Sequence, residues 1–234
     1  MSMATREDGR PKRALVTGVS SGIGEAIAQR LLAEGWNVVG FSRSKPGFAA
    51  VGLTHKAVDL SDREALAAAL KGLEPLDAIV HAAGILRVGR LGELDPENAR
   101  EMWRLHVDAP EQILESLVPS LPDGARIVLL GSRTAGGSPG RAQYAATKAA
   151  VVGMARSFAI ELAPRLITVN VVAPGATDTP MLRDPRRASV TPKMPPIGRL
   201  VKPEEIAATT AFLLSDGAAS ITGQQIIVCG GASL

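Results

Sequence analysis

The sequence predicts an α/β protein with a seven-stranded parallel sheet that is doubly wound and flanked by helices. Short apolar runs alternate with segments of helical periodicity along the whole chain. The runs are continuously apolar, as in strands that helices cover on both faces. A glycine-rich turn separates the first run from the first helix. Right-handed crossovers between such strands place helices on both faces of the sheet.

The composition fits one globular domain. The chain has 234 residues, of which 46% are hydrophobic and 21% are charged. The net charge of +3 is small and no long basic run occurs, which argues against nucleic-acid binding. We expect a flexible tail over residues 1–12 and a single domain over residues 13–234.

The sequence also indicates the cellular compartment in which the protein is expected. Cys229 is the only cysteine, so no intramolecular disulfide can form, which fits a reducing environment. The first thirteen residues contain no apolar segment of the signal-peptide type. No uninterrupted apolar stretch reaches the about 20 residues that a spanning helix needs. We expect a soluble, cytoplasmic protein without a membrane partner.

The expected strands are the apolar runs at residues 14–17, 36–41, 57–60, 78–81, 127–130, 167–172 and 225–228. The first helix is predicted by Ile23, Ile27 and Leu31, which recur every four residues on one helix face, and Gly35 ends it.

The later helices carry start and stop signals. Ser61 with Glu64 three residues on predicts a capping box. Asp95 followed by Pro96 predicts the start of a long helix, and Pro164 predicts the end of another. The expected helices are residues 61–70, a segment that starts at 95–96, residues 142–163 and residues 203–214.

The turn T-G-V-S-S-G-I-G, residues 17–24, lies between the first strand and the first helix. Glycines let the backbone approach a phosphate, and a helix N-terminus offers free N–H groups to an anion. This position is typical of the phosphate-binding turn of Rossmann-type dinucleotide-binding domains. The expected contacts are Gly18, Ser20, Ser21, Gly22, Ile23 and Gly24.

The end of the second strand indicates the kind of nicotinamide cofactor. NAD-binding domains usually place a carboxylate there, against the ribose hydroxyls. Here Ser42 and Arg43 follow the strand, and both suit a ribose phosphate. The sequence therefore favours NADP over NAD. The alternative is that Arg43 and Lys45 belong to a solvated loop.

An acid–base pair is predicted from Tyr144 and Lys148, which lie four residues apart on one helix face. An ammonium group beside a phenol favours the phenolate, so we expect Lys148 to lower the pKa of Tyr144. Ser132 follows the strand at 127–130, at the sheet edge where such folds bind ligands. Its hydroxyl is placed to hold a substrate oxygen.

Together the glycine turn, Ser132, the Tyr144–Lys148 pair and the segment N-V-V-A-P-G-A-T-D-T at 170–179 resemble the short-chain dehydrogenase/reductase family over about residues 14–231. The resemblance implies an NADP-dependent oxidoreductase that interconverts a carbonyl and a secondary alcohol by hydride transfer. Tyr144 would be the general acid and base, Lys148 would also bind the nicotinamide ribose, and Ser132 would polarise the substrate oxygen.

The resemblance implies further cofactor contacts. Thr177 would meet the carboxamide through its backbone and Thr179 would add a hydroxyl. Asp59 would contact the adenine amine, with capping of the next helix as an equal alternative. The full set is Asp59, Leu60, Ala82, Ala83, Gly84, Tyr144, Lys148, Pro174, Gly175, Thr177 and Thr179.

The sequence departs from the family at His81, His106 and Cys229. His106 stands where a fourth catalytic residue is usually Asn, whose backbone carbonyl holds a water that leads to the lysine. Pro110 lacks the N–H that would bond this carbonyl in a regular helix, so His106 can keep that function. Alternatively, His106 packs inertly. We expect His81 to be a satisfied interior residue, and the three histidines have no metal-ligand spacing.

Substrate and assembly are predicted only broadly. Residues 77–87 and 175–179 are similar to 2,3-dihydro-2,3-dihydroxybenzoate dehydrogenases, which use NAD on a cyclic diol; 3-oxoacyl-[acyl-carrier-protein] reductases are the other plausible branch. A cofactor-binding sensor without turnover and a nucleotide-sugar isomerase or epimerase are the rival classes. The helix at 142–163 is rich in small residues, and the resemblance implies a homotetramer formed through it.

Overall fold

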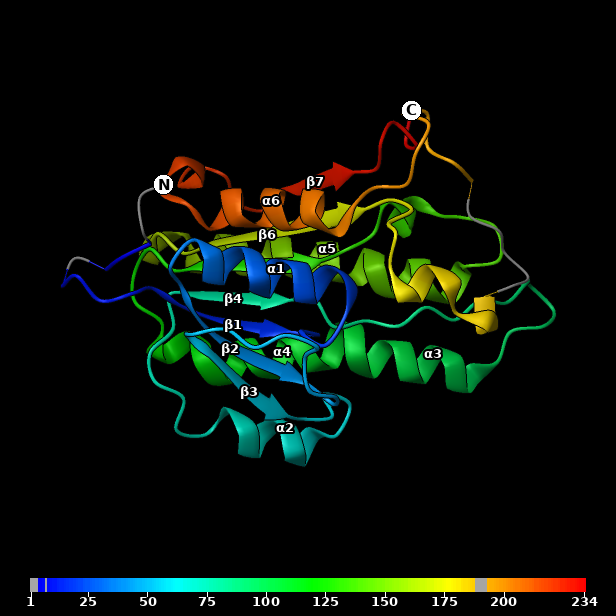
Figure 1. Cartoon of the computed structure of the whole chain (residues 1–234). Helices are drawn as coiled ribbons and strands as arrows, with labels where there is room; N and C mark the ends of the chain where they lie inside the picture. Colours follow the sequence, from blue (N-terminus) through cyan, green and yellow to red (C-terminus); the bar gives the residue numbers. More distant parts are fainter. Residues whose placement is uncertain (1–3, 7, 188–192) are drawn as a thin grey trace.

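The computed structural model describes residues 4–6, 8–187 and 193–234. They contain a seven-stranded sheet in the order β3-β2-β1-β4-β5-β6-β7, and each neighbouring pair is parallel (Figure 1). This confirms the predicted fold class. The strands are β1 (Arg13–Thr17), β2 (Asn37–Ser42), β3 (Leu53–Ala57), β4 (Ala78–His81), β5 (Arg126–Leu130), β6 (Thr168–Pro174) and β7 (Gln225–Val228).

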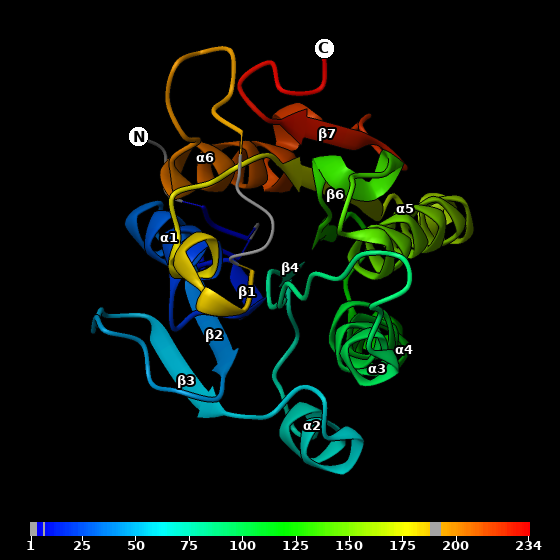
Figure 2. The same cartoon turned by 90° about the vertical axis from the view of Figure 1, so that its right-hand side faces the viewer.

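Helices cover both faces of the sheet (Figure 2). On one face α1 and α6 pack together, and on the other α2, α4 and α5 bury their apolar side chains. A π-helical turn, Arg104–Asp108, joins α3 to α4. The helices are α1 (Gly22–Ala33), α2 (Arg63–Leu70), α3 (Pro96–Trp103), α4 (Ala109–Leu117), α5 (Ala142–Leu162) and α6 (Pro203–Leu214).

The two apolar cores explain why the helices hold to the sheet. Ile27 and Leu31 of α1, which predicted that helix, are fully buried on one face. Ile113 of α4 and Val151 of α5 are buried on the other face. Burial of each such side chain contributes about 1.5–3 kcal/mol. None of the helices in the described part of the chain is long and apolar enough to cross a membrane.

The topology leaves a crevice at the carboxyl edge of the sheet. β1 lies between β2 and β4. From β1 the sheet first extends through β2 to β3 on one side, and from β4 it extends through β5 and β6 to β7 on the other, so the winding direction changes between β1 and β4. Thr17 at the end of β1 lies opposite Phe41 of β2 and His81 of β4. In open α/β sheets, ligands bind where the winding direction changes.

Two predicted elements are wrong in detail. The third strand is Leu53–Ala57 rather than residues 57–60, because β3 is a partly exposed edge strand and has no continuous apolar run. The apolar residues Val58 and Leu60 are buried in the connection that follows it.

The capping box at Ser61 is also absent. Asp62 is the N-cap of α2, and its carboxylate accepts hydrogen bonds from the N–H groups of Glu64 and Ala65. Ser61 instead donates its hydroxyl and its N–H to Asp59. An aspartate one residue further along provides a stronger, charged acceptor for the helix N-terminus.

The described part of the predicted flexible tail is held against the domain. Thr5 and Pro11 form an antiparallel bridge, and Arg6 forms an ion pair with Asp77 at 2.9 Å. Asp77 also accepts a hydrogen bond from the N–H of Arg13. The segment therefore folds back onto the amino ends of β1 and β4 instead of leading away from the domain at residue 12.

Candidate active site

Two adjoining cavities open along the carboxyl edge of the sheet. The glycine cavity lies against the turn at residues 17–24 and the end of β2. The tyrosine cavity lies against the ends of β5 and β6 and the start of α5. The two form one continuous crevice because they share the lining residues Ile23, Ala82, Gly84, Ile85, Thr179 and Met181.

The fold brings nearly all the predicted site residues to this crevice. His106 is the exception and lies buried behind it. The predicted residues in the glycine cavity are Gly18, Ser20, Ser21, Gly22, Ile23, Gly24, Ser42, Arg43, Asp59, Leu60, Ala82, Ala83 and Gly84. Those in the tyrosine cavity are Ser132, Tyr144, Lys148, Pro174, Gly175, Thr177 and Thr179.

The turn at residues 17–24 depends on the absence of side chains. Gly18 has φ +76°, and a Cβ there would lie 3.0 Å from the backbone of Ala83. A Cβ on Gly24 would lie 2.3 Å from the carbonyl oxygen of Gly18. Ser21, the N-cap of α1, makes no side-chain hydrogen bond to the helix. The helix therefore presents an uncapped N-terminus to the crevice, which suits a phosphate.

The far end of the glycine cavity contains the residues that predicted cofactor choice. The Arg43 side chain is exposed, whereas Ser42 is buried. The Ser42 hydroxyl donates to the Ser44 carbonyl and contacts Nε2 of His55 at 3.0 Å, so it is already engaged. Asp59 accepts two bonds from Ser61, which makes it a turn residue of the connection to α2 as well as a cavity residue.

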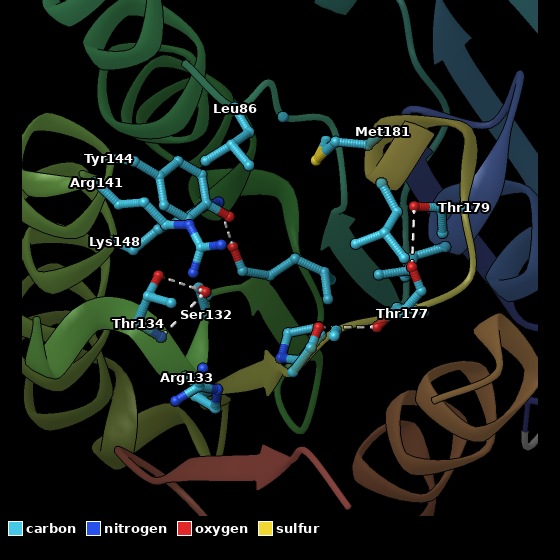
Figure 3. A pocket seen from close by; sticks show the side chains of 18 of the residues that line it. Leu86, Ser132, Arg133, Thr134, Arg141, Tyr144, Lys148, Thr177, Thr179 and Met181 are labelled. Carbon is cyan, nitrogen blue, oxygen red and sulfur yellow. Dashed lines mark hydrogen bonds between the residues drawn. The ribbon is translucent and has the colours of Figure 1, made fainter. Parts of the chain in front are cut away.

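Ser132, Tyr144 and Lys148 converge on one side of the tyrosine cavity (Figure 3). Ser132 caps a short 3-10 helix, accepts a bond from the N–H of Thr134 and contacts the Thr134 hydroxyl at 2.9 Å. The Lys148 ammonium lies 5.8 Å from the centre of the Tyr144 ring and donates to the Leu130 carbonyl at 2.8 Å. The spacing on α5 thus places the pair together as predicted.

The predicted lowering of the Tyr144 pKa is wrong. Burial raises the pKa of Tyr144 above its usual value of 10.0, and the Ser132 hydroxyl and the charges of Arg187 and Arg141 oppose that rise. Burial also lowers the pKa of Lys148 to about 7. The phenol therefore stays protonated at neutral pH, and Lys148 is the group of the pair that titrates there.

His81 links β1, β4 and the π-helical turn. The Thr17 hydroxyl accepts bonds from the N–H groups of Ala82 and Ala83, so its own proton goes to Nδ1 of His81 at 3.1 Å. Nε2 of His81 donates to the Leu105 carbonyl at 3.0 Å. This network needs a neutral ring, and burial together with the charge of Lys148 lowers the pKa of His81 to about 3. His81 is the satisfied interior residue that the sequence predicted.

His106 makes a second link of the same kind. It is fully buried, and Nε2 accepts a bond from the N–H of Ile85 at 3.1 Å. Nδ1 then carries the proton and donates to the Thr147 hydroxyl at 2.8 Å, which donates to the Tyr144 carbonyl at 2.9 Å. Burial and the charge of Lys148 lower its pKa well below 6.5. The ring also meets the Tyr144 ring edge-on at 5.6 Å. His106 therefore positions α5 and does not pack inertly.

The chain departs from α-helical geometry where Pro110 predicted it. Residues Arg104–Asp108 form the π-helical turn, and the N–H of Ala109 bonds the Arg104 carbonyl. The turn also frees the Leu105 carbonyl for His81. A water held by the His106 carbonyl stays a prediction.

Sequence reasoning missed three arginines of the tyrosine cavity: Arg133, Arg141 and Arg187. Two of them had a signal in the sequence, since Arg133 directly follows Ser132 and Arg141 precedes Tyr144 by three residues. Arg187 had none, because a loop more than forty residues away along the chain carries it to the cavity.

Comparisons with known proteins identify relatives of this chain. A family model described as enoyl-(acyl carrier protein) reductase matches residues 18–233. The chain is 36% identical to the 3-oxoacyl-[acyl-carrier-protein] reductase of Escherichia coli, over 94% of this chain and 96% of that protein.

Solved structures are similar over nearly the whole chain. The 3-ketoacyl-(acyl-carrier-protein) reductase of Brucella melitensis, complexed with NADH, superposes with a TM-score of 0.86 at 32% identity, covering 96% of this chain and 99% of that one. A blue fluorescent protein from a metagenomic library, in complex with NADPH, superposes with a TM-score of 0.81 at 31% identity over the same shares.

The buried neutral histidines predict an acid-sensitive fold. Because the folded pKa of His81 is about 3 and its ordinary value is 6.5, the unfolded chain takes up the proton first as the pH falls. The contribution to the free energy of unfolding is complete above pH 6.5 and is lost progressively towards pH 3. The stability lost through His81 between pH 8 and pH 5 is about 2 kcal/mol.

The measurement is urea unfolding between pH 8 and pH 4.5 for the wild type and for His81→Asn. The variant should be less stable at pH 8, where no histidine is charged in either state, and should lose less stability on acidification. Equal losses in the two proteins would show that His81 is not a buried neutral group.

Proposed function

The chain belongs to the short-chain dehydrogenase/reductase family and is an oxidoreductase that interconverts a carbonyl and an alcohol with a nicotinamide cofactor, and we propose that Ser132, Tyr144 and Lys148 perform the reaction. The observation that carries the proposal is their convergence in a cavity that joins the glycine cavity. A reacting carbonyl beside Tyr144 would then also lie beside a cofactor laid along the crevice.

The proposed chemistry divides between the cofactor and the chain. A bound nicotinamide supplies the hydride to carbon in reduction and accepts it in oxidation. Tyr144 Oη gives a proton to the carbonyl oxygen in reduction and removes one from the alcohol in oxidation. The Ser132 hydroxyl hydrogen-bonds the same oxygen, and the buried Lys148 ammonium, with its pKa near 7, restores the proton of Tyr144.

The raised pKa of Tyr144 keeps this side chain in its phenol form at neutral pH. A protonated phenol is the form that can donate a proton. Oxidation requires Tyr144 to lose its proton first, and we propose that Lys148 takes this proton onwards.

The glycine cavity fits a dinucleotide. Its walls contain the close approach of Gly18 to Ala83, which a Cβ would fill, and the uncapped start of α1. We propose that Gly18, Ser20, Ser21, Gly22, Ile23 and Gly24 hold the pyrophosphate, Asp59 and Leu60 the adenine, and Ala82, Ala83 and Gly84 the ribose side of the crevice. On the other wall, Pro174, Gly175, Thr177 and Thr179 would hold the carboxamide end, with Tyr144 and Lys148 at the nicotinamide ribose.

We propose NADP as the physiological cofactor and retain NAD as the alternative. Arg43 lines the glycine cavity at the end of β2 and forms no ion pair within the described residues. Its exposed guanidinium is free to meet a 2′-phosphate, and Ser42 can join it after its hydroxyl leaves Ser44.

We also propose a cytoplasmic homotetramer that uses α5 in an interface. The outer face of this helix exposes Ala146, Ala149, Gly153 and Ile160. Small residues let a second helix approach closely, and Ile160, which is 77% exposed, would be buried by it. The single cysteine fits a reducing cytoplasm.

A 3-oxoacyl thioester is the alternative substrate class, favoured by the 36% identity to a 3-oxoacyl-[acyl-carrier-protein] reductase. A sensor that binds the cofactor without turnover is the alternative of a different class. The close packing of three reactive groups argues against a sensor, since cofactor binding alone would not need Ser132 and Tyr144.

The catalytic assignment predicts distinct effects for two variants. Tyr144→Phe should lower turnover by about 10²-fold or more and leave cofactor binding intact, because general acid catalysis typically contributes 10²–10⁴. Lys148→Met should impair both. NADPH oxidation at 340 nm with a reducible ketone, together with calorimetric titration of NADPH, measures the two effects. A near-normal rate in Tyr144→Phe would refute the mechanism.

The cofactor proposal predicts a selective loss. Arg43→Ala should weaken NADPH binding by about ten- to a hundredfold, the worth of a charge-assisted hydrogen bond of 1.5–3 kcal/mol, and leave NADH binding nearly unchanged. Calorimetric titration of both cofactors measures this, with Lys45→Ala as a control in the same loop. Equal losses for both cofactors, or tighter binding of NADH by the wild type, would contradict the assignment.

A further inference from the structure

The tyrosine cavity has an unusual balance of charge. Its lining contains five cationic side chains and no aspartate or glutamate among the described residues. The proton-transfer scheme uses only Lys148 of the five. The others are Arg133, Arg141, Arg187 and Lys193.

Two of these arginines are poorly satisfied. Arg187 is 8% exposed, its Nη1 donates to the Met181 carbonyl at 3.3 Å, and its Nε is buried without a hydrogen-bond partner in the described structure. Arg141 donates from Nη1 to the Ser138 hydroxyl at 3.1 Å, and its Nε is likewise buried and unpartnered. Within the described residues neither one pairs with a carboxylate.

Neighbouring arginines show that carboxylates are available in this region. Arg183 pairs with Asp178 and Arg186 pairs with Asp184, within the segment that carries Arg187. Those two guanidinium groups lie outside the cavity, and the one that faces it is left without such a pair. In this segment the arginines at the surface, Arg183 and Arg186, pair with carboxylates, and Arg187, which lines the cavity, does not.

The unpaired charges lie close together and close to the phenol. Burial lowers the pKa of Arg187, and the charge of Arg141 lowers it further. Burial and Arg133 have the same effect on Arg141. The charges of Arg187 and Arg141 in turn lower the pKa of Tyr144. The charge of Asp184, which pairs with Arg186, only partly offsets the burial of Arg187. A buried and a half-buried guanidinium that pair with no carboxylate in the described residues are costly, so the cavity suits an anion.

The cofactor is a poor candidate for that anion. Arg133, Arg141 and Arg187 line only the tyrosine cavity and none lines the glycine cavity, which holds the phosphate-binding turn. Figure 3 shows Arg141 on the side of Tyr144 and Ser132, across the cavity from Thr177, Thr179 and Met181. The charges therefore face the place of the reacting carbonyl.

We propose that the substrate carries an oxyanion group, a carboxylate or a phosphate, which Arg141 and Arg187 hold beside the reacting carbonyl oxygen. This rests on the proposed function, because Tyr144 defines where that oxygen lies. The planar guanidinium fork matches either oxyanion with paired hydrogen bonds. Arg133, whose Nη1 donates to the Ala232 carbonyl, adds a third arginine to the lining of the cavity. The apolar side chains of Ile85, Leu86 and Leu182 leave room for a hydrocarbon part.

The test uses substrate pairs that differ mainly in charge. The carboxylate arm is 2-oxo-, 3-oxo- and 4-oxopentanoate, each with its methyl ester, and the phosphate arm is dihydroxyacetone phosphate with dihydroxyacetone. A neutral 3-oxobutanoyl N-acetylcysteamine thioester represents the alternative substrate class. We expect kcat/KM for at least one anion to exceed that of its neutral partner about ten- to a hundredfold, the worth of 1.5–3 kcal/mol. The arm with the larger ratio identifies the oxyanion.

Variants locate the effect. Arg141→Gln and Arg187→Gln should each lower kcat/KM for the anion about tenfold or more beyond any change for its neutral partner, so that the preference for the anion disappears. Arg183→Gln, at an exposed and ion-paired position in the same segment, should keep the preference. Circular dichroism and thermal unfolding confirm that each variant is folded, and the two cavity variants test the site independently.

The outcomes separate this proposal from the proposed function. If the neutral compounds react as well as the anions, or if the arginine variants lower both alike, the oxyanion site is wrong and the oxidoreductase assignment stands. If no compound oxidises NADPH, the catalytic assignment fails for this panel. Calorimetry with the NADP⁺ complex then decides the site: binding of an anion that Arg141→Gln abolishes supports it, and absence of binding overturns it.

Discussion

Two neutral imidazoles tie the end of the sheet to the helices that form the crevice. Thr17 at the end of β1 bonds His81 at the end of β4, and His81 bonds the Leu105 carbonyl. His106 on the same π-helical turn then bonds the loop after β4 and, through Thr147, the backbone of Tyr144. Charging His81 would break the bond that it accepts from the Thr17 hydroxyl, and charging His106 would break the bond that it accepts from the N–H of Ile85. Either change would weaken the connection between the glycine cavity and α5.

These links hold together the loops on the two sides of the crevice. The topology separates the connections that leave β1 and β4, and nothing in the sheet ladder holds those loops together. The Thr17 hydroxyl does so by accepting two N–H groups of the loop after β4. The π-helical turn contributes because it releases a carbonyl that a regular helix would have used internally. The π-helical turn is therefore needed for the hydrogen bond between Leu105 and His81.

Most of the fold could be predicted from the sequence because buried parallel strands and amphipathic helices leave strong local patterns. The glycine turn could also be predicted, because Gly18 and Gly24 admit no side chain and the fold therefore requires glycine at positions that are visible in the sequence. The edge strand β3 was misplaced because exposure on one side removes the continuous apolar run that marks central strands. Arg187 was missed because tertiary folding brings it to the cavity, and no local pattern records that contact.

The electrostatics of the site show the same limit. The four-residue spacing correctly placed Lys148 beside Tyr144, yet the inferred direction of the pKa shift was reversed. Spacing along a helix reports which groups are neighbours. It does not report how completely the fold removes them from water. At this site burial raises the pKa of Tyr144 by more than the Ser132 hydroxyl and the charges of Arg187 and Arg141 lower it.

The most direct test of the two-imidazole connection is ¹⁵N NMR of the histidine rings at pH 7. Long-range proton–nitrogen spectra distinguish the two tautomers from each other and from the charged ring. The account predicts that both rings are neutral, with the proton of His81 on Nε2 and that of His106 on Nδ1. A ring protonated on both nitrogens, or the opposite tautomer in either residue, would contradict it.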